Sequence, residues 1–384
     1  MTLHFDRAEF EERQRRARAA LAEAGLDGLL IFRQESMYYL TGYDTFGYCF
    51  FQCLYLGADG VLALLTRAPD LRQAEQTSII DDIRIWRDDD NADPAGDLRR
   101  MLADLGCQGK RLGVEYEAAG LTAANGKRLE AALSDWCKLR DASDLVNELR
   151  VVKGAAELSY VRRAAELADQ ALDLAVRMAR PGAFEGDILA AMQGAVFRGG
   201  GDYPGNAFII GSGPGALLCR YHAGRRQLSA QDQLTLEFAG SYRHYHACLM
   251  RTLLIGEADP AHVEMHAICH EALEACIDQL RPGRTAGEVF TAHADVLGRS
   301  GFGDHRLNAC GYSLGATYPP VWMDRPMFFA DSPFVLAAGM VFFLHIILMD
   351  SPNERAMTLG TTVEITDGGP SLLSRAPLDL VVNG

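Results

Sequence analysis

Apolar residues alternate between helical and strand spacings over the first third of the chain. Residues 8–25 repeat apolar positions every three to four residues, which predicts an amphipathic helix, and the apolar run at 25–32 predicts a buried strand. Two further apolar runs flank a glycine-containing turn at 57–60 and predict a hairpin. Helix-forming stretches on either side of 111–115 leave room there for another short strand. The pattern predicts an α/β domain.

The pattern changes near residue 150. Residues 141–157 show no strand spacing and lead into a long amphipathic helix at 155–180, which ends at a Pro-Gly breaker. Groups of helical spacings and groups of strand spacings then follow one another, which is typical of an α+β domain with an antiparallel sheet. We expect domains at 1–150 and 151–384. The expected elements of the second are helices at 260–281 and 286–300 and strands at 205–212, 233–240, 246–256, 309–318, 339–349 and 359–366.

Composition limits the classes of partner. The 384 residues are 48% hydrophobic and 23% charged, the balance of a globular protein. The formal net charge is −14, and no run of Lys or Arg would track a phosphate backbone. No segment has the roughly 20 apolar residues of a membrane-spanning helix, and the N-terminus lacks the apolar core of a signal peptide. We expect a cytoplasmic protein that binds neither nucleic acid nor a membrane.

Nine cysteines are scattered along the chain without a Cys-x-x-Cys pair. This distribution argues against a disulfide framework and against a structural zinc site, and it fits a reducing compartment. Cys53, Cys107, Cys137 and Cys276 are therefore expected to be small buried apolar residues, with no part in chemistry.

Four clusters in the second domain place ionisable side chains in unusual surroundings. Glu237 lies inside an apolar strand, where a carboxylate is rarely buried without a partner or a role. Tyr312, between glycines, is either a hydrogen-bond donor to a developing anion or a core aromatic. His345 interrupts an apolar strand, and a hydrogen-bonded core histidine is the alternative to a catalytic one. His222, after a glycine-rich loop, is a surface or structural histidine when taken alone.

Two more histidines follow Glu237 on the same predicted strand. His244 and His246 are expected on one strand face and Tyr245 on the other, because successive side chains alternate across a strand. Only one of these faces can look into a site, and the sequence leaves open which histidine does so.

Taken together, these clusters resemble the creatinase/prolidase/methionine-aminopeptidase superfamily over essentially the whole chain. LRVVKGAAELSYVRRAAELAD at 149–169 is similar to the segment that leads into the family's C-terminal domain. LRPG at 280–283 is similar to the turn between its two long helices. The resemblance implies an α/β N-terminal domain and an α+β "pita-bread" (creatinase/aminopeptidase-like) C-terminal domain. It also implies a homodimer in which the N-terminal domain of one subunit caps the partner's site, so residues 43–52 are expected to act there.

Metal-dependent members of this superfamily bind two divalent ions through two Asp, one His and two Glu. In this chain the five positions fall on or near Glu237, Cys248, Tyr312, His345 and Gly360. Only Glu237 keeps an oxygen ligand of the expected kind, and Glu364 is an offset alternative to the last position. Because two hard cations need several carboxylates, we expect the metal site to be lost, with no metal and no cofactor.

Among metal-free relatives, three stretches resemble ectoine hydrolases, which open a cyclic amidine. They are LTGYD at 40–44, EFAGSYRHYH from Glu237 onward, and GYSLGATYPPVW at 311–322. The resemblance implies hydrolysis of a C–N bond in a small amidine- or guanidine-type substrate that carries a carboxylate. The alternatives are a creatinase-like amidinohydrolase with another substrate, a metal-dependent Xaa-Pro dipeptidase, and a non-catalytic binding protein.

The resemblance also implies a role for each residue. Glu237 would attack the substrate carbon or activate water, and His222 would pass a proton to the leaving nitrogen. Tyr312 and His345 would hold the tetrahedral centre, while Arg220 or Arg225 would pair with the substrate carboxylate. The residues expected to bind substrate are Tyr43, Asp44, Phe46, Arg220, Tyr242, His246, Tyr318 and Trp322.

Overall fold

The computed structural model describes residues 3–220 and 224–384, and its chain divides into two units, Met1–Arg150 and Val151–Gly384. The first unit is built on a six-stranded mixed sheet of order β4-β3-β2-β1-β5-β6. Its elements are α1 (Arg7–Ala24), β1 (Gly28–Ile31), α2 (Gln34–Thr41), η1 (Gly47–Cys49), β2 (Cys53–Gly57), β3 (Leu62–Arg67), η2 (Ala68–Asp70), α3 (Leu71–Thr77), β4 (Asp82–Trp86), α4 (Pro94–Asp104), β5 (Arg111–Val114), α5 (Ala123–Leu133), β6 (Lys138–Asp141) and α6 (Leu145–Val151).

The predicted hairpin of the first unit is present. β2 pairs antiparallel with both β1 and β3, whereas β5 lies parallel to β1. The pattern missed β4 and β6, which form the two edges of the sheet. Both carry charged side chains that are at least partly exposed, and edge strands of this kind lack a buried apolar run.

The second unit has a nine-stranded sheet of order β11-β10-β12-β13-β9-β8-β7, with β14 paired to β13 and β15 to β9. Its neighbouring strands run antiparallel, except for β15 beside β9. The elements are α7 (Ala155–Met178), α8 (Glu185–Arg198), β7 (Ile209–Ser212), η3 (Gly213–Leu217), β8 (Asp232–Tyr242), β9 (Tyr245–Ile255), α9 (Pro260–Gln279), α10 (Ala286–Arg299), η4 (Gly303–His305), β10 (Gly311–Ser313), β11 (Asp324–Met327), β12 (Val341–Asp350), η5 (Ser351–Asn353), β13 (Arg355–Thr366), β14 (Gly369–Leu372) and β15 (Val381–Asn383).

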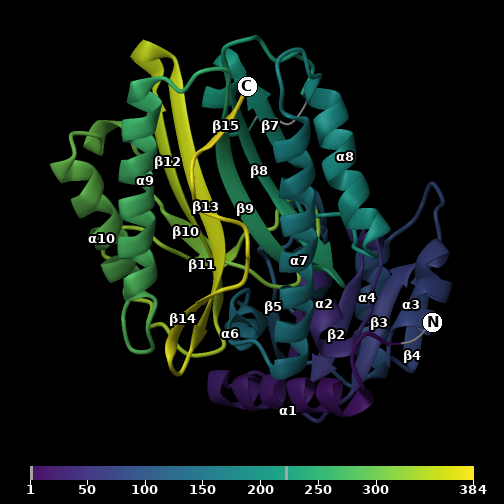
Figure 1. Ribbon diagram of the computed structural model, residues 1–384. Helices are drawn as coiled ribbons and strands as arrows, with labels where there is room; N and C mark the ends of the chain where they lie inside the picture. Colours follow the sequence, from purple (N-terminus) through teal and green to yellow (C-terminus); the bar gives the residue numbers. More distant parts are fainter. Residues whose placement is uncertain (1–2, 221–223) are drawn as a thin grey trace. The chain divides into compact units, whose positions relative to one another are not determined.

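Helices cover one face of this sheet. Figure 1 shows α9 beside β12 and β13, and α7 beside β8 and β9. Leu344 and Ile346 of β12 pack into the apolar core under α9 and α10. Ala247 of β9 packs against the alanines of α7 in the same way. Because side chains alternate along a strand, the residues between them, such as His345 and Cys248, point to the opposite face.

The turn between β8 and β9 corrects one expectation. β8 ends at Tyr242 and β9 begins at Tyr245, and the two residues between them, Arg243 and His244, have φ of 50° and 65°. A two-residue turn with positive φ at both positions suits the right-handed twist of a hairpin. His244 therefore lies in a turn, and it does not share a strand face with His246.

No helix among residues 3–220 and 224–384 is both long enough and apolar enough to cross a membrane.

Candidate active site

Four strands carry one row of side chains on the face of the sheet that the helices leave uncovered. Glu237 of β8 lies opposite Met250 of β9, Met250 lies opposite Gly360 of β13, and Gly360 lies opposite His345 of β12. Directly paired residues project from the same face of a sheet. Tyr312 of β10 joins the row, because it pairs with the residue two positions before His345.

A cavity of about 190 Å³ opens over this row. In the part of the chain that the structure describes, one side chain of its wall is a carboxylate and one is a guanidinium. The polar lining consists of Asn206, Cys219, Arg220, Glu237, Tyr312 and His345. The apolar lining is formed by Leu307, Ala309, Val321, Trp322, Met323, Met327 and Ile347. The cavity thus suits a small ligand with few charged groups.

Among the described residues, Glu237 is the only acidic side chain in the lining of this cavity. Burial raises the pKa of its carboxyl to about 7, although the hydrogen bond from Tyr312 and the charge of Arg220 act in the other direction. Both protonation states are therefore populated near neutral pH. A carboxyl group in this range can act as a base, a nucleophile or an acid.

Tyr312 connects two cavity residues through its hydroxyl group. The hydroxyl donates to Oε1 of Glu237 at 3.2 Å and accepts from the indole Nε1 of Trp322 at 2.8 Å. Burial, followed by the charge of Glu237, raises the pKa of Tyr312 well above its usual range. The phenol consequently keeps its proton and serves as a hydrogen-bond donor.

His345 presents a neutral imidazole to the cavity. Burial lowers its pKa to about 3, with a smaller contribution from His293. Its ring lies 5.6 Å from the Tyr312 ring, centroid to centroid. Its Nδ1 is buried and has no hydrogen-bond partner within residues 3–220 and 224–384. A buried ring nitrogen without a partner is costly, and a bound ligand could satisfy it.

Of the expected site residues, the structure brings five to this cavity: Glu237, Tyr312, His345, Arg220 and Trp322. His222 and its neighbours at 221 and 223 lie outside the described residues. The proposed proton transfer by His222 therefore stays a prediction.

His246 contacts two loops through its ring nitrogens, and its expected role in substrate binding stays a prediction. Its Nε2 accepts a hydrogen bond from the backbone N–H of Gly205 at 2.8 Å. Its Nδ1 lies 3.1 Å from the hydroxyl of Thr317. Both ring nitrogens are thus used inside the protein, and burial lowers the pKa to about 4. The imidazole is neutral and does not line the cavity.

Three aromatic residues also lie elsewhere than expected. Tyr318 stacks on His244, with centroids 4.2 Å apart. Tyr242 packs beside Tyr160 of α7, because it is five positions from Glu237 in β8 and so projects from the opposite face. Tyr43 is fully buried in the core of the first unit, where its hydroxyl bonds to Thr66. None of the three lines the cavity.

Two expected residues remain in the first unit. The backbone N–H of Asp44 donates to the hydroxyl of Thr77, and Phe46 is 80% exposed. Their expected place in a partner subunit's site stays a prediction.

Several cavity residues were not expected from the sequence. Ile347 lies two positions after His345, so the strand alternation alone would have found it. Asn206 and Cys219 lie between regular elements, where no periodicity indicates direction. Met323 precedes the short edge strand β11 and Met327 is its last residue, and the pattern missed this strand.

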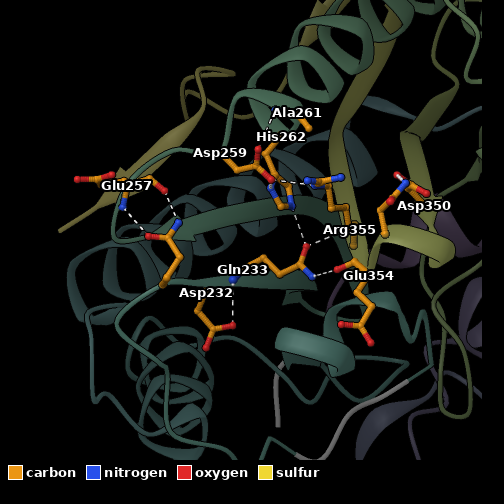
Figure 2. A network of polar contacts seen from close by, with 12 residues as sticks. Asp232, Gln233, Glu257, Asp259, Ala261, His262, Asp350, Glu354 and Arg355 are labelled. Atoms are coloured by element: carbon orange, nitrogen blue, oxygen red, sulfur yellow. Dashed lines mark hydrogen bonds and ion pairs between the residues drawn. The ribbon is translucent and has the colours of Figure 1, made fainter.

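A second, more polar cavity of about 350 Å³ lies at the other end of β8, around Gln233. Two ion pairs lie in its wall: Arg226 with Asp232, and Arg355 with Asp259 at 2.8 Å. Figure 2 shows Gln233 at the centre of this network. The carboxylates of Glu257 and Glu354 also line the cavity.

Comparisons with known proteins agree on the family. The model of metallopeptidase family M24 matches residues 159–367, and the model of the creatinase/prolidase N-terminal domain matches residues 13–152. These matches confirm the resemblance to the creatinase/prolidase superfamily and the expected two-domain fold class.

Several relatives match over nearly the whole chain. Ectoine hydrolase of Halomonas elongata is 26% identical over 401 residues, which cover 100% of this chain and 99% of that protein. A probable dipeptidase PepE of Mycobacterium tuberculosis is 27% identical over 386 residues, 98% of each chain. Among solved structures, dipeptidase PepE from Mycobacterium ulcerans has a TM-score of 0.84 at 26% identity, covering 98% of this chain and 99% of its own. A prolidase from Thermococcus sibiricus has a TM-score of 0.88 at 19% identity, covering 97% and 99%, which shows the fold alone.

The residues present do not fit the metal centre that the family name implies. The described residues contain no group of three or more His, Cys, Asp or Glu side chains that could hold a metal ion. Burial raises the pKa of the Cys248 thiol, which disfavours the thiolate that binds metal. A side chain at Gly360 would meet the Phe343 ring at 2.8 Å. Glu364 is bound instead by Arg162, at 2.8 Å.

Proposed function

The chain belongs to metallopeptidase family M24, and within this family we propose that it is a hydrolase that works without a metal ion. Its substrate would be a small amidine- or guanidine-type compound, with ectoine or 5-hydroxyectoine favoured. One observation carries this proposal. On the face of the sheet where the cavity lies, Glu237 is accompanied by Tyr312, His345 and a glycine, and no second carboxylate lines the cavity within residues 3–220 and 224–384.

The size and lining of the cavity support a small substrate. About 190 Å³ accommodates a compact single-ring molecule. The guanidinium of Arg220 lies in the described part of the wall, and we propose that it binds the substrate carboxylate. The full-length similarity to an ectoine hydrolase favours a cyclic amidine that carries a carboxylate. Creatine, a guanidine-type carboxylate, is the second substrate of this class.

The chemistry proposed for the cavity begins at Glu237. In its ionised form the carboxylate takes a proton from water as the water oxygen bonds to the amidine carbon, or it attacks that carbon itself and water then cleaves the resulting ester. The C–N bond breaks, and the leaving nitrogen takes up the proton, with His222 proposed as the carrier. Tyr312 donates a hydrogen bond, and the neutral ring of His345 contacts the tetrahedral centre.

We also propose a homodimer in which residues 43–52 complete the partner's site. Two exposed aromatic side chains of this segment, Phe46 and Phe50, support this arrangement, because together they give the segment an apolar surface that a partner subunit would cover. Phe46 and Asp44 would then act on the partner's substrate.

A metal-dependent dipeptidase is the second candidate, and the match to PepE proteins favours it. It requires bound metal in stoichiometric amount. The residue set around Glu237 speaks against it, since two divalent cations need more than one carboxylate.

The first experiment is to incubate chelator-treated protein with ectoine, 5-hydroxyectoine and creatine in one tube and to follow the mixture by proton NMR. Loss of an ectoine signal is the expected result, and Glu237→Gln should reduce the rate by orders of magnitude while circular dichroism stays unchanged. Near wild-type turnover by Glu237→Gln would remove that residue from the mechanism. Activity on a Xaa-Pro dipeptide that appears only with Mn²⁺ or Co²⁺ would overturn the metal-free proposal.

A further inference from the structure

The indole of Trp322 lies behind Tyr312 in a chain of hydrogen bonds that ends at Glu237. Its Nε1 is 2.8 Å from the Tyr312 hydroxyl, which in turn is 3.2 Å from Oε1 of Glu237. Both aromatic side chains are almost completely buried, with 2% and 3% exposed. The chain is therefore shielded from solvent on the side of the tryptophan.

We infer that Trp322 is a positioning residue that fixes the direction of this chain. Its N–H occupies a lone pair of the Tyr312 oxygen and so directs the phenolic proton onto Oε1 of Glu237, which leaves Oε2 as the oxygen that meets substrate. The catalytic consequence of this assignment rests on the proposed function. The direction of the hydrogen bonds does not, because it is a property of the protein without substrate.

The direction follows from the chemistry of the three groups. An indole N–H can only donate, whereas a phenol has one proton and can also accept. Tyr312 must therefore accept from Trp322, and its own proton is available to Glu237. Accepting one hydrogen bond also makes a hydroxyl a stronger donor in the next. Among the described residues, Oε2 of Glu237 accepts no hydrogen bond from the protein.

Two loops hold Trp322 in place. The backbone of Gly205 lies close to the loop that carries Trp322. A Cβ added at Gly205 would lie 2.8 Å from the Val321 carbonyl oxygen and 3.1 Å from the Trp322 Cα. His246 binds the Gly205 N–H with one ring nitrogen and lies 3.1 Å from the Thr317 hydroxyl with the other. His246 therefore connects the Gly205 backbone to Thr317, five positions before Trp322.

The test uses the three tryptophans of the chain, which give three indole N–H signals in a ¹⁵N–¹H spectrum of labelled full-length protein. Trp322→Phe identifies one of them. Trp86, whose N–H bonds to the Phe51 carbonyl in the first unit, and Trp136 are internal references. We expect the Trp322 signal to move as the pH is raised through about 7, where Glu237 ionises, and the two reference signals to stay fixed.

Two variants separate the links of the chain. Glu237→Gln should abolish the pH-dependent movement while leaving the Trp322 signal in its hydrogen-bonded range. Tyr312→Phe should move the signal upfield and end its response to pH. A Trp322 signal that is unchanged in Tyr312→Phe overturns the inference, whether or not ectoine is the substrate.

The kinetic consequence is tested with Trp322→Phe, which keeps an aromatic ring but is smaller and lacks the N–H donor. Without that hydrogen bond the Tyr312 hydroxyl donates less strongly to Glu237, so the ionised carboxylate is less stabilised. The midpoint of the pH profile of kcat should therefore rise by roughly half to one pH unit, which corresponds to the free energy of one hydrogen bond. KM should change less than kcat. An unshifted profile overturns the positioning role. If no ectoine is consumed by the wild type, the proposed function fails while the spectra still decide the inference.

Discussion

At the scale of single residues, burial and hydrogen bonding act in opposite directions on Glu237. The cavity withholds water from the carboxylate, and the hydrogen bond from Tyr312 only partly offsets that loss. A carboxyl group that titrates near neutral pH costs stability but gains reactivity. By contrast, the pKa of Asp259 is lowered by a hydrogen bond from a backbone N–H and by one from Arg355.

The rate of hydrolysis should depend on pH through Glu237. Because the ionised carboxylate is the reactive form, kcat/KM is expected to rise with pH around a midpoint of about 7 and to level off above it. Initial rates between pH 5.5 and 8.5 measure this midpoint. A profile without an inflection in that range would exclude Glu237 as the group that must ionise.

Folding stability should respond in the opposite sense. The pKa of Glu237 is about 7 in the folded protein against an ordinary value of 4.5, so its contribution to stability is fully present below pH 4.5 and is lost as the pH rises to 7. Glu237→Gln, which stays neutral, is therefore expected to be more stable than the wild type at pH 8, by about 1–3 kcal/mol. Urea unfolding of both proteins at pH 5 and pH 8 measures the difference, and equal differences at both pH values would refute it.

At the scale of elements, one buried amide joins β8 to three other segments. Gln233 donates to the carbonyl oxygens of Glu354 and Gly213, and its own oxygen accepts from Ala356 N–H and from His262 of α9 (Figure 2). Every hydrogen-bonding site of the side chain is used, which is what a buried amide requires. The network fixes the end of β8 that lies away from the Arg243-His244 turn.

Removal of this amide should destabilise the second unit. Gln233→Leu keeps a similar volume and leaves four protein groups without partners, so we expect a loss of about 2–4 kcal/mol in the free energy of unfolding. Gln231→Leu is the matched control, because Gln231 bonds only to the backbone of Glu257 at an exposed position and should cost less than about 1 kcal/mol. Equal losses in the two variants would contradict the central role of Gln233.

At the scale of the whole molecule, the proposed homodimer makes a prediction about mixed dimers. A Glu237→Gln subunit and a Phe46→Ala subunit each lack one part of the site. If Phe46 acts in the partner's site, every mixed dimer contains one intact site, and an equimolar mixture after random exchange should regain roughly a quarter of the wild-type activity. Two inactive variants that stay inactive after exchange would place Phe46 in the site of its own subunit or outside any site.

The sequence predicted the fold of the second unit more completely than the residues that line its cavity. Glu237, Tyr312 and His345 could be selected because each is a polar residue in an apolar strand, and the sheet places all three at one cavity. His246 shows the limit of such reasoning. Its position beside the hairpin looks functional, yet both ring nitrogens bind backbone or hydroxyl groups of loops that are distant in sequence.

The family and the two-domain fold could be predicted from the sequence alone, because periodicity, glycines and residue types are local properties of the chain. Which aromatic residues reach the cavity depends on the tertiary structure. Tyr318 and Trp322 lie four residues apart in one loop, but one stacks on His244 and the other bonds to Tyr312. The direction of a loop side chain depends on contacts with distant segments such as Gly205, and no local pattern records them.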